Sequence, residues 1–417
     1  MSDATDFRRA EFADRVRFVC TLAARLHQFG TSAPRLESAV GEVAERLELN
    51  TQIWSNPTGI IISFAERGPG GDDLAQLTQV IRLAPGDNDL RRLSMVDRIA
   101  EEVRAGRLGI TEGYRQLREL DRAPGWTGRI VRAVAHGVAA GAVAVLFGLG
   151  GADVGVAAIN GLAIGLLGLQ AGRNAHFAAG YEAMAALMAA LFTAWYSAQV
   201  APLAVNTVLV SSLIVLLPGM MLTTAVNELA MQHLVAGMSR FAGAGAVLLK
   251  LGFGTAAGLE IAHVLGFPYR SVPAQAGPEW LAWAAVAVGS LNFAILFKTD
   301  YRDYPLVMLS SATGYFMARW FGTHYGAEFA AFAAGLGVGV LANIYARLVS
   351  RPGALVRVPG IIMLVPGSTG FRSLFLAIRG DVAQGLDTAF ALLLLLIALV
   401  AGLLFANVLV TPRRTLS

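Results

Sequence analysis

The feature that most constrains this chain is a series of long apolar runs that begins near Gly128. A membrane-spanning helix needs about 20 mainly apolar residues to cross about 30 Å of hydrocarbon. We place ten such runs, at residues 130–150, 152–171, 177–197, 201–221, 237–260, 279–298, 304–321, 327–348, 354–370 and 384–410. The series predicts a polytopic α-helical membrane protein with ten transmembrane helices.

The charged residues are concentrated before these runs. Residues 1–129 hold 37 of the 62 charged residues of the chain, which has 33 Lys and Arg and 29 Asp and Glu. This asymmetry predicts a soluble domain over residues 1–128. The first twenty residues contain no apolar core followed by a small-residue cleavage site, so we expect no signal peptide and a cytoplasmic location for this domain.

The expected soluble domain mixes two periodicities. Residues 12–49 repeat apolar positions at helical spacing, with a break at "FGTSAP". "TQIWSNPTGIIISFAER" indicates two short strands around a turn, and a third strand is expected before the Pro-Gly of residues 85–86. Residues 89–120 return to helical spacing. The domain is therefore predicted to be a small α+β fold.

Basic residues predict how the spans are oriented. With the soluble domain inside the cell, eleven basic residues of the membrane part fall on cytoplasmic flanks and four on the other side. Ten spans also return the chain to its starting side. We therefore expect a multi-pass protein of the cytoplasmic (inner) membrane with both termini in the cytoplasm.

Two Pro-Gly pairs interrupt the apolar runs. "LLPG" ends at Gly219 and "LVPG" ends at Gly367, an offset of 148 residues at which Gly237 also matches Gly385. We expect each pair to lie between the fourth and fifth spans of a five-span unit. Because five is odd, the second unit enters the membrane upside down, which predicts two inverted repeats over residues 129–270 and 271–417.

Proline removes a backbone donor and interrupts a helix. In transporters built from inverted repeats, broken helices near the middle of the membrane expose backbone groups to a substrate. The Pro-Gly pairs are thus expected either to face a substrate path or only to end a span at the membrane surface.

Several separated segments resemble the threonine/serine exporter family. Residues 25–64 and 79–106 look like its soluble domain, residues 213–240 like the Pro-Gly segment of its first half, and residues 292–316 and 346–374 like its second half. The resemblance implies a ten-span inner-membrane carrier that exports small hydroxy amino acids, driven by the proton motive force. Some members of the family handle dicarboxylates instead. An Arg-Asp pair frequent in the family is replaced here by Asn227-Glu228.

A zwitterionic substrate needs donors for its carboxylate, acceptors for its ammonium group and hydroxyl partners. Each Ser or Thr candidate has the alternative of bonding its own helix backbone, and Asn160 that of linking helices. The candidate substrate-binding residues are Asn160, Ser211, Ser212, Pro218, Gly219, Thr223, Asn227, Ser310, Ser311, Pro366, Gly367, Ser368 and Thr369.

Two carboxylates are candidates for proton coupling. Glu182 lies within the expected third span, where a carboxylate is costly unless it is paired, hydrated or protonated. Glu228 follows the first Pro-Gly pair. Lys250, also mid-span, either pairs with an acid such as Glu182 or extends toward the membrane edge, and we expect the second.

The remaining motifs of the sequence give no indication of enzymatic activity. A turn explains "NPTG" beside Ser63, and no Gly-x-Ser-x-Gly elbow or phosphate-binding loop occurs. The six His residues and the single Cys show no metal-ligand spacing, so no metal or other cofactor is expected. The expected partners are a small-molecule substrate (threonine, serine or similar), protons and the lipid bilayer, without nucleic acid; a homo-oligomer is left open. The alternatives are a dicarboxylate (succinate-type) exporter and a passive channel with a regulatory soluble domain.

Overall fold

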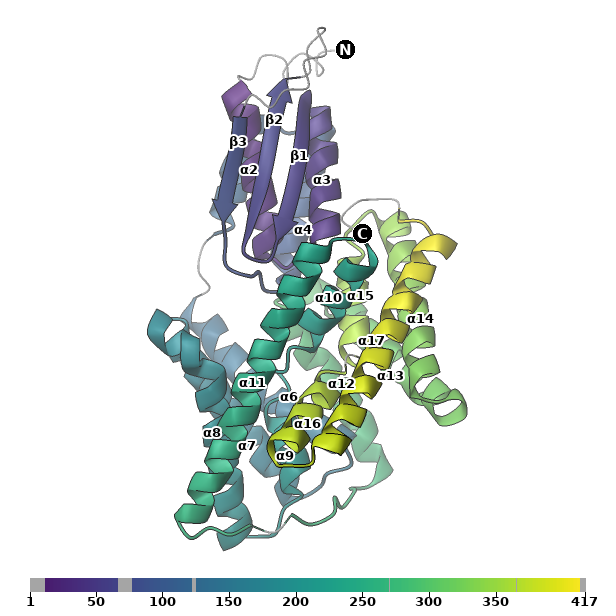
Figure 1. Ribbon diagram of the computed structural model, residues 1–417. Helices are drawn as coiled ribbons and strands as arrows, with labels where there is room; N and C mark the ends of the chain where they lie inside the picture. The colour runs from purple at the N-terminus through teal and green to yellow at the C-terminus, as the bar shows by residue number, and fades with distance from the viewer. Residues whose placement is uncertain (1–11, 67–76, 122–124, 270, 365, 413–417) are drawn as a thin grey trace.

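The protein has an N-terminal domain placed at one end of a helical bundle (Figure 1). The computed structural model describes residues 12–66, 77–121, 125–269, 271–364 and 366–412. The last described helix, α17 (Val382–Leu409), ends at the end of the bundle that faces the N-terminal domain.

The N-terminal domain packs helices against one face of a three-stranded sheet. The strands are antiparallel in the order β1-β2-β3. The elements are α2 (Phe12–Gln28), α3 (Ala33–Arg46), β1 (Leu49–Asn56), β2 (Gly59–Glu66), β3 (Leu77–Arg82), α4 (Leu90–Arg104) and α5 (Ile110–Glu119). These elements confirm the small three-stranded sheet with helices that the sequence predicts.

The β1–β2 turn and the sheet face agree with the sequence pattern. Asn56 lies opposite Gly59, which leaves a two-residue loop, and its side-chain oxygen accepts a hydrogen bond from the Thr58 amide at 3.0 Å. Ile60, Ile62 and Phe64 alternate along β2 and are fully buried. Period-two burial of this kind is what a sheet covered on one face requires.

The bundle follows as a continuous series of helices. They are α6 (Trp126–Leu146), α7 (Ala152–Ala171), α8 (Ala175–Gln199), α9 (Val205–Ser212), α10 (Gly219–Ala230), α11 (Leu234–Val264), α12 (Glu279–Leu296), α13 (Tyr304–Tyr325), α14 (Ala327–Val349), α15 (Ala354–Ile362), α16 (Gly367–Ile378) and α17 (Val382–Leu409), with a 3₁₀ turn, Tyr301–Asp303, before α13.

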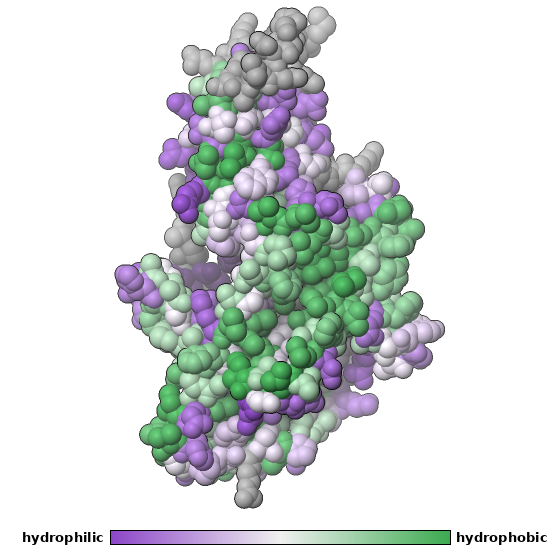
Figure 2. Space-filling model, viewed as in Figure 1, coloured by the Kyte–Doolittle hydropathy of each residue, from purple (hydrophilic) through white to green (hydrophobic). Residues whose placement is uncertain are grey.

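Eight segments of the described chain are long and apolar enough to cross a membrane. They include α15 and α16 taken together, but neither α13 nor the α9–α10 segment. Apolar side chains cover much of the visible bundle surface around α11 and α17, whereas the N-terminal domain exposes mostly polar ones (Figure 2). The bundle is therefore a multi-pass membrane domain.

The structure corrects the expected position of the Pro-Gly pairs. Each pair lies inside the fourth segment of its half, not between the fourth and fifth spans, because helix resumes directly after it as α10 or α16. Pro218 and Pro366 each precede the first residue of the new helix. Proline is well tolerated at a helix start, where its missing amide hydrogen would have had no partner in the helix. The expected spans 201–221 and 354–370 therefore end too early, because the broken segments continue to Ala230 and Ile378.

The N-terminal domain packs directly on the bundle, and residues of the bundle are part of its hydrophobic core. Phe297, Ala354 and Leu355 of the membrane part belong to the same buried cluster as α2, α3 and α4. The Leu90 amide donates to the Phe297 carbonyl at 3.0 Å, and Lys298 pairs with Asp87 at 2.7 Å. These contacts fix the domain at one end of the bundle.

Glycines allow the long helices to approach closely. α8 packs on α11 and α14 on α17. A Cβ at Gly254 would lie 2.2 Å from the Ala183 carbonyl oxygen, and one at Gly402 would lie 2.2 Å from that of Phe332. Small residues at such crossings let helix backbones meet in a membrane.

We predict that Gly402→Ala destabilises the bundle by about 1–3 kcal/mol, because the added methyl group meets backbone that can yield only if α14 and α17 separate. The control is Gly155→Ala in α7, where an added Cβ meets nothing within 4 Å. Its effect is expected to lie within about 1 kcal/mol and to be stabilising. Thermal unfolding of the detergent-solubilised protein checks both, and equal melting temperatures for the two variants would contradict the close packing.

Candidate functional site

The two Pro-Gly breaks meet in the structure. A Cβ added to Gly367 would lie 3.1 Å from Cα of Gly219 and 3.3 Å from Cβ of Leu217. Pro218 is near the middle of the α9–α10 segment, and Pro366 is near the middle of the α15–α16 segment. Two segments that are 148 residues apart in the sequence are therefore both interrupted at one place.

Two helices begin at this meeting point. α10 starts at Gly219 and α16 at Gly367. The first amide groups of a helix have no partner within it, and the helix dipole places partial positive charge there. Two adjacent helix N-termini favour an anionic group such as a carboxylate.

A cavity of about 500 Å³ adjoins the breaks, and we call it the break cavity. Pro218, Gly219, Gly367 and Ser368 are among its lining residues. Arg132 and His136 of α6 also line it, as does Phe147 directly after that helix. The remaining polar lining residues are Asp87 and Asn88 of the N-terminal domain, Lys298 and Tyr315. The break cavity thus runs from the N-terminal domain into the bundle.

The charged lining of the break cavity escaped the sequence reasoning. Arg132 and His136 lie one turn apart on α6, and Val143 and Phe147 continue the same stripe. The His136 Nδ1 atom is 2.7 Å from the Arg132 carbonyl oxygen. Because a carbonyl only accepts, Nδ1 carries the hydrogen of the neutral ring and Nε2 is left as a proton acceptor. The helical spacing of Arg132 and His136 was the available signal.

The predicted hydroxyl groups largely support the broken segments. Ser211 and Thr223 donate to carbonyls of their own helices, at 2.8 and 3.2 Å. On the other side, Ser310 donates to the Val356 carbonyl at 2.5 Å and Ser311 to that of Pro359 at 3.1 Å. α13 thus supplies donors to α15, the helix that leads to the second break.

Asn160 holds the helix that leads to the first break. Its side-chain amide donates to Thr193 at 2.9 Å and to Ser212 at 3.2 Å, and the residue is 2% exposed. This network ties α7 and α8 to α9. The structure therefore places Asn160 and Ser212 in the support of the break, away from the lining of the break cavity.

The two predicted acids also lie outside that lining. Glu182 pairs with Lys250 at 3.4 Å, joining α8 to α11. This corrects our expectation that Lys250 extends toward the membrane edge: the helices approach so closely through Gly254 that the ammonium group reaches the carboxylate.

The second predicted acid, Glu228, is fully buried. Its carboxylate accepts from the Ala33 amide at 3.0 Å and from Arg240 at 2.9 Å.

Glu228 is thus a contact between the bundle and the N-terminal domain. Ala33 is the first residue of α3, and its amide has no partner within that helix. Nearby, Glu37 lies 3.6 Å from His233, and burial raises the pKa of Glu37. The acid retained in place of the family's Asp has two partners that only the tertiary fold supplies.

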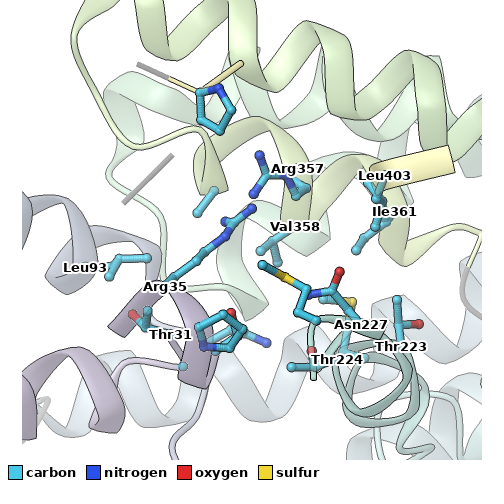
Figure 3. A pocket seen from close by; sticks show the side chains of 18 of the residues that line it. Thr31, Arg35, Leu93, Thr223, Thr224, Asn227, Arg357, Val358, Ile361 and Leu403 are labelled. Atoms are coloured by element: carbon cyan, nitrogen blue, oxygen red, sulfur yellow. The ribbon is translucent and has the colours of Figure 1, made fainter. Parts of the chain in front are cut away.

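A second cavity, of about 370 Å³, lies between the N-terminal domain and the bundle, and we call it the interdomain cavity (Figure 3). The predicted residues Thr223 and Asn227 line it. The structure therefore divides the predicted residues between the break cavity, the interdomain cavity and the polar supports of the breaks. Pro366 and Thr369 flank the lining residues Gly367 and Ser368.

Comparison with known proteins identifies the family. A family model described as "Putative threonine/serine exporter" matches residues 17–262, and one described as "Threonine/Serine exporter, ThrE" matches residues 282–409. The chain belongs to the threonine/serine exporter family. This is a family of membrane transporters, and the two matches together cover both the N-terminal domain and the bundle.

Relatives of this chain include fungal proteins that are named as membrane proteins. "Pheromone-regulated membrane protein 10" of Saccharomyces cerevisiae is 25% identical over 91% of this chain and 49% of its own length. The protein of the same name from Candida glabrata is 24% identical over 91% of this chain and 48% of its own length. The chain thus spans about half the length of these relatives. No solved structure matches it.

We predict that Glu228→Ala destabilises the protein by about 3–5 kcal/mol, because it leaves Arg240 partly buried without its partner and the Ala33 amide without an acceptor. The measurement is thermal unfolding in detergent. The matched control is Glu119→Ala, which removes an exposed acid that also pairs with an arginine, Arg115, at 2.9 Å. It is expected to cost less than about 1 kcal/mol. Similar losses for both variants would show that Glu228 does not hold the domains together.

Proposed function

We propose that this protein is a secondary-active transporter that exports threonine, serine or similar small polar metabolites across the cytoplasmic (inner) membrane, by proton antiport. The observation that carries the proposal is the meeting of the two Pro-Gly breaks at a cavity within the bundle. Non-helical backbone at membrane depth is tolerated where it lines a cavity or is covered by protein. The family assignment supports the same class of activity.

The same proposal includes ten spans in two inverted repeats, over residues 129–270 and 271–417, after an N-terminal domain of residues 1–128. Matching contacts support it: α10 packs on α11 as α16 packs on α17, and α11 packs on α16 as α17 packs on α10. A Cβ at Gly237 would meet Ala225 and Leu229. A Cβ at Gly385 would meet Ser373 and Ala377, which are the residues 148 positions after Ala225 and Leu229.

We assign the substrate to the two helix starts. Its carboxylate would bind at the amides that begin α10 and α16, and Ser368 and Thr369 would offer hydroxyl partners. Carbonyl groups where α9 and α15 end would accept from the ammonium group. This arrangement uses Pro218, Gly219, Pro366 and Gly367 for backbone shape, and the support residues Asn160, Ser211, Ser212, Ser310 and Ser311 for holding it.

Proton coupling has three candidate groups. Glu182 and Glu228 are the carboxylates that the sequence suggests, one paired with Lys250 and one with Arg240. His136 lines the break cavity itself, and within the described residues only its Nδ1 has a hydrogen-bond partner. We propose no enzymatic role for the N-terminal domain. The domain and both termini would lie on the cytoplasmic side, a proposal that the distribution of basic residues supports.

A dicarboxylate exporter is the second candidate function. Arg132 and Lys298 add positive charge to the lining of the break cavity, where Asp87 is the acid opposite Lys298, and His136 would add a third positive charge on taking up a proton. A substrate with two carboxylates would use one at the helix starts and the other at these basic groups.

We expect proteoliposomes that contain the protein to move labelled threonine and serine against their gradients when a pH gradient is imposed, and to stop when a protonophore collapses it. Labelled succinate tests the second candidate in the same assay. Downhill flux that persists unchanged with the protonophore would indicate a channel, and movement of succinate alone would replace the amino acid substrate.

Filling the junction of the breaks should stop transport. Gly367→Leu places a side chain where even a Cβ would lie 3.1 Å from Gly219, so we expect at least a tenfold loss of transport rate. Gly245→Leu in α11, where an added Cβ meets nothing within 4 Å, is the control and should keep the wild-type rate. Full activity of the Gly367→Leu protein at equal abundance in the vesicles would place the substrate path elsewhere.

A further inference from the structure

The interdomain cavity contains two arginines without a carboxylate partner. Arg35 of α3 and Arg357 of α15 both line it, and their side chains extend into the same space (Figure 3). In the described part of the chain, neither guanidinium has an Asp or Glu within ion-pair distance. The two cations come from the N-terminal domain and from the bundle, respectively.

Donor groups in this cavity also lack acceptors. Arg357 is only 7% exposed: its Nη2 donates to Asn343 at 2.9 Å, but its buried Nη1 has no hydrogen-bond partner among the described residues. Thr31 is 8% exposed, and its hydroxyl oxygen is likewise buried without a partner. Buried donors of this kind are destabilising unless a ligand or water accepts from them.

The charge of the lining favours an anion. Glu42 is the acid among the lining residues, and its charge acts on Arg104 outside the cavity. Glu228, close by, is occupied by Ala33 and Arg240. Burial lowers the pKa of Arg35 to about 10, which still leaves it charged at neutral pH. Among the described residues, the lining of the cavity therefore contributes two cations, one acid and otherwise neutral side chains.

We propose that the interdomain cavity binds a small carboxylate-bearing metabolite between Arg35 and Arg357. The planar fork of a guanidinium matches the two oxygens of a carboxylate, and two forks from opposite walls can hold one carboxylate or the two ends of a dicarboxylate. A volume of about 370 Å³ admits a small metabolite. Thr224, Asn227 and Asn407 offer neutral polar partners for the rest of the ligand.

The ligand would connect the N-terminal domain to both broken segments of the bundle. Arg35 belongs to α3, Arg357 to α15, and Thr224 and Asn227 to α10, so one bound anion bridges the domain to a half-helix of each broken segment. Resting on the transport function proposed above, this makes the cavity a regulatory site: occupancy favours the docked arrangement of the N-terminal domain and thereby changes the transport rate.

The test is equilibrium dialysis of the purified full-length protein in detergent with labelled threonine, labelled succinate and inorganic phosphate as separate probes. It is performed on the Gly367→Leu protein as well, in which the break cavity is filled. We expect a carboxylate probe to bind both proteins, and Arg35→Gln to weaken this binding at least tenfold. Arg35→Lys, which keeps the charge but loses the fork, should weaken it less.

Arg17→Gln is the matched control, since Arg17 is an exposed arginine of α2 whose side chain is 68% exposed, and it should leave binding unchanged. Binding that survives both Arg35→Gln and Arg357→Gln overturns the proposal, as does binding that disappears in the Gly367→Leu protein alone. Binding of phosphate without either carboxylate overturns the ligand class. Because no gradient is used, these outcomes do not depend on transport, so a failed transport assay and a failed binding assay remain distinguishable.

Discussion

The structure depends on how a membrane domain satisfies the backbone of two helices that stop halfway. A broken helix leaves amides at one end and carbonyls at the other, and lipid offers them no partner. Here the two breaks lie against each other, and polar side chains of neighbouring helices support the segments that lead to them: Asn160 of α7 on α9, Ser310 and Ser311 of α13 on α15. The result is backbone that lines a cavity and is covered by neighbouring helices.

The close helix packing follows from the same requirement. A bundle that encloses irregular backbone must shield it on all sides, and the glycines of α11 and α17 bring α8 and α14 near enough to do so. Closer approach also creates contacts that isolated helices would lack. The pairing of Lys250 with Glu182 is one of these, since a charge that lies on one helix finds its counterpart on the next.

The N-terminal domain is integrated into this arrangement by buried polar contacts. Glu228, at the end of α10, accepts from the start of α3, so the first broken segment and the domain share one carboxylate. The core of the domain also includes residues of the loop before α13 and of α15. Both broken segments therefore contact the domain directly, and the interdomain cavity lies between the domain and these two segments.

The sequence by itself determined the class of this protein, the order of its elements and the presence of two matched breaks. Hydropathy and the periodicity of apolar residues are local properties, and they are sufficient to place the strands and most spans, whereas the Pro-Gly pairs lie inside the fourth segment of each half and not after it. The sequence also singled out Pro218, Gly219 and Gly367, because proline and glycine act on their own backbone, and these residues line the break cavity together with their neighbour Ser368. Only the tertiary structure decided that the breaks touch, that Arg132 and His136 line their cavity, and that Glu228 faces Ala33. These facts depend on which helix faces are opposed, and no local pattern encodes the partner of a buried charge.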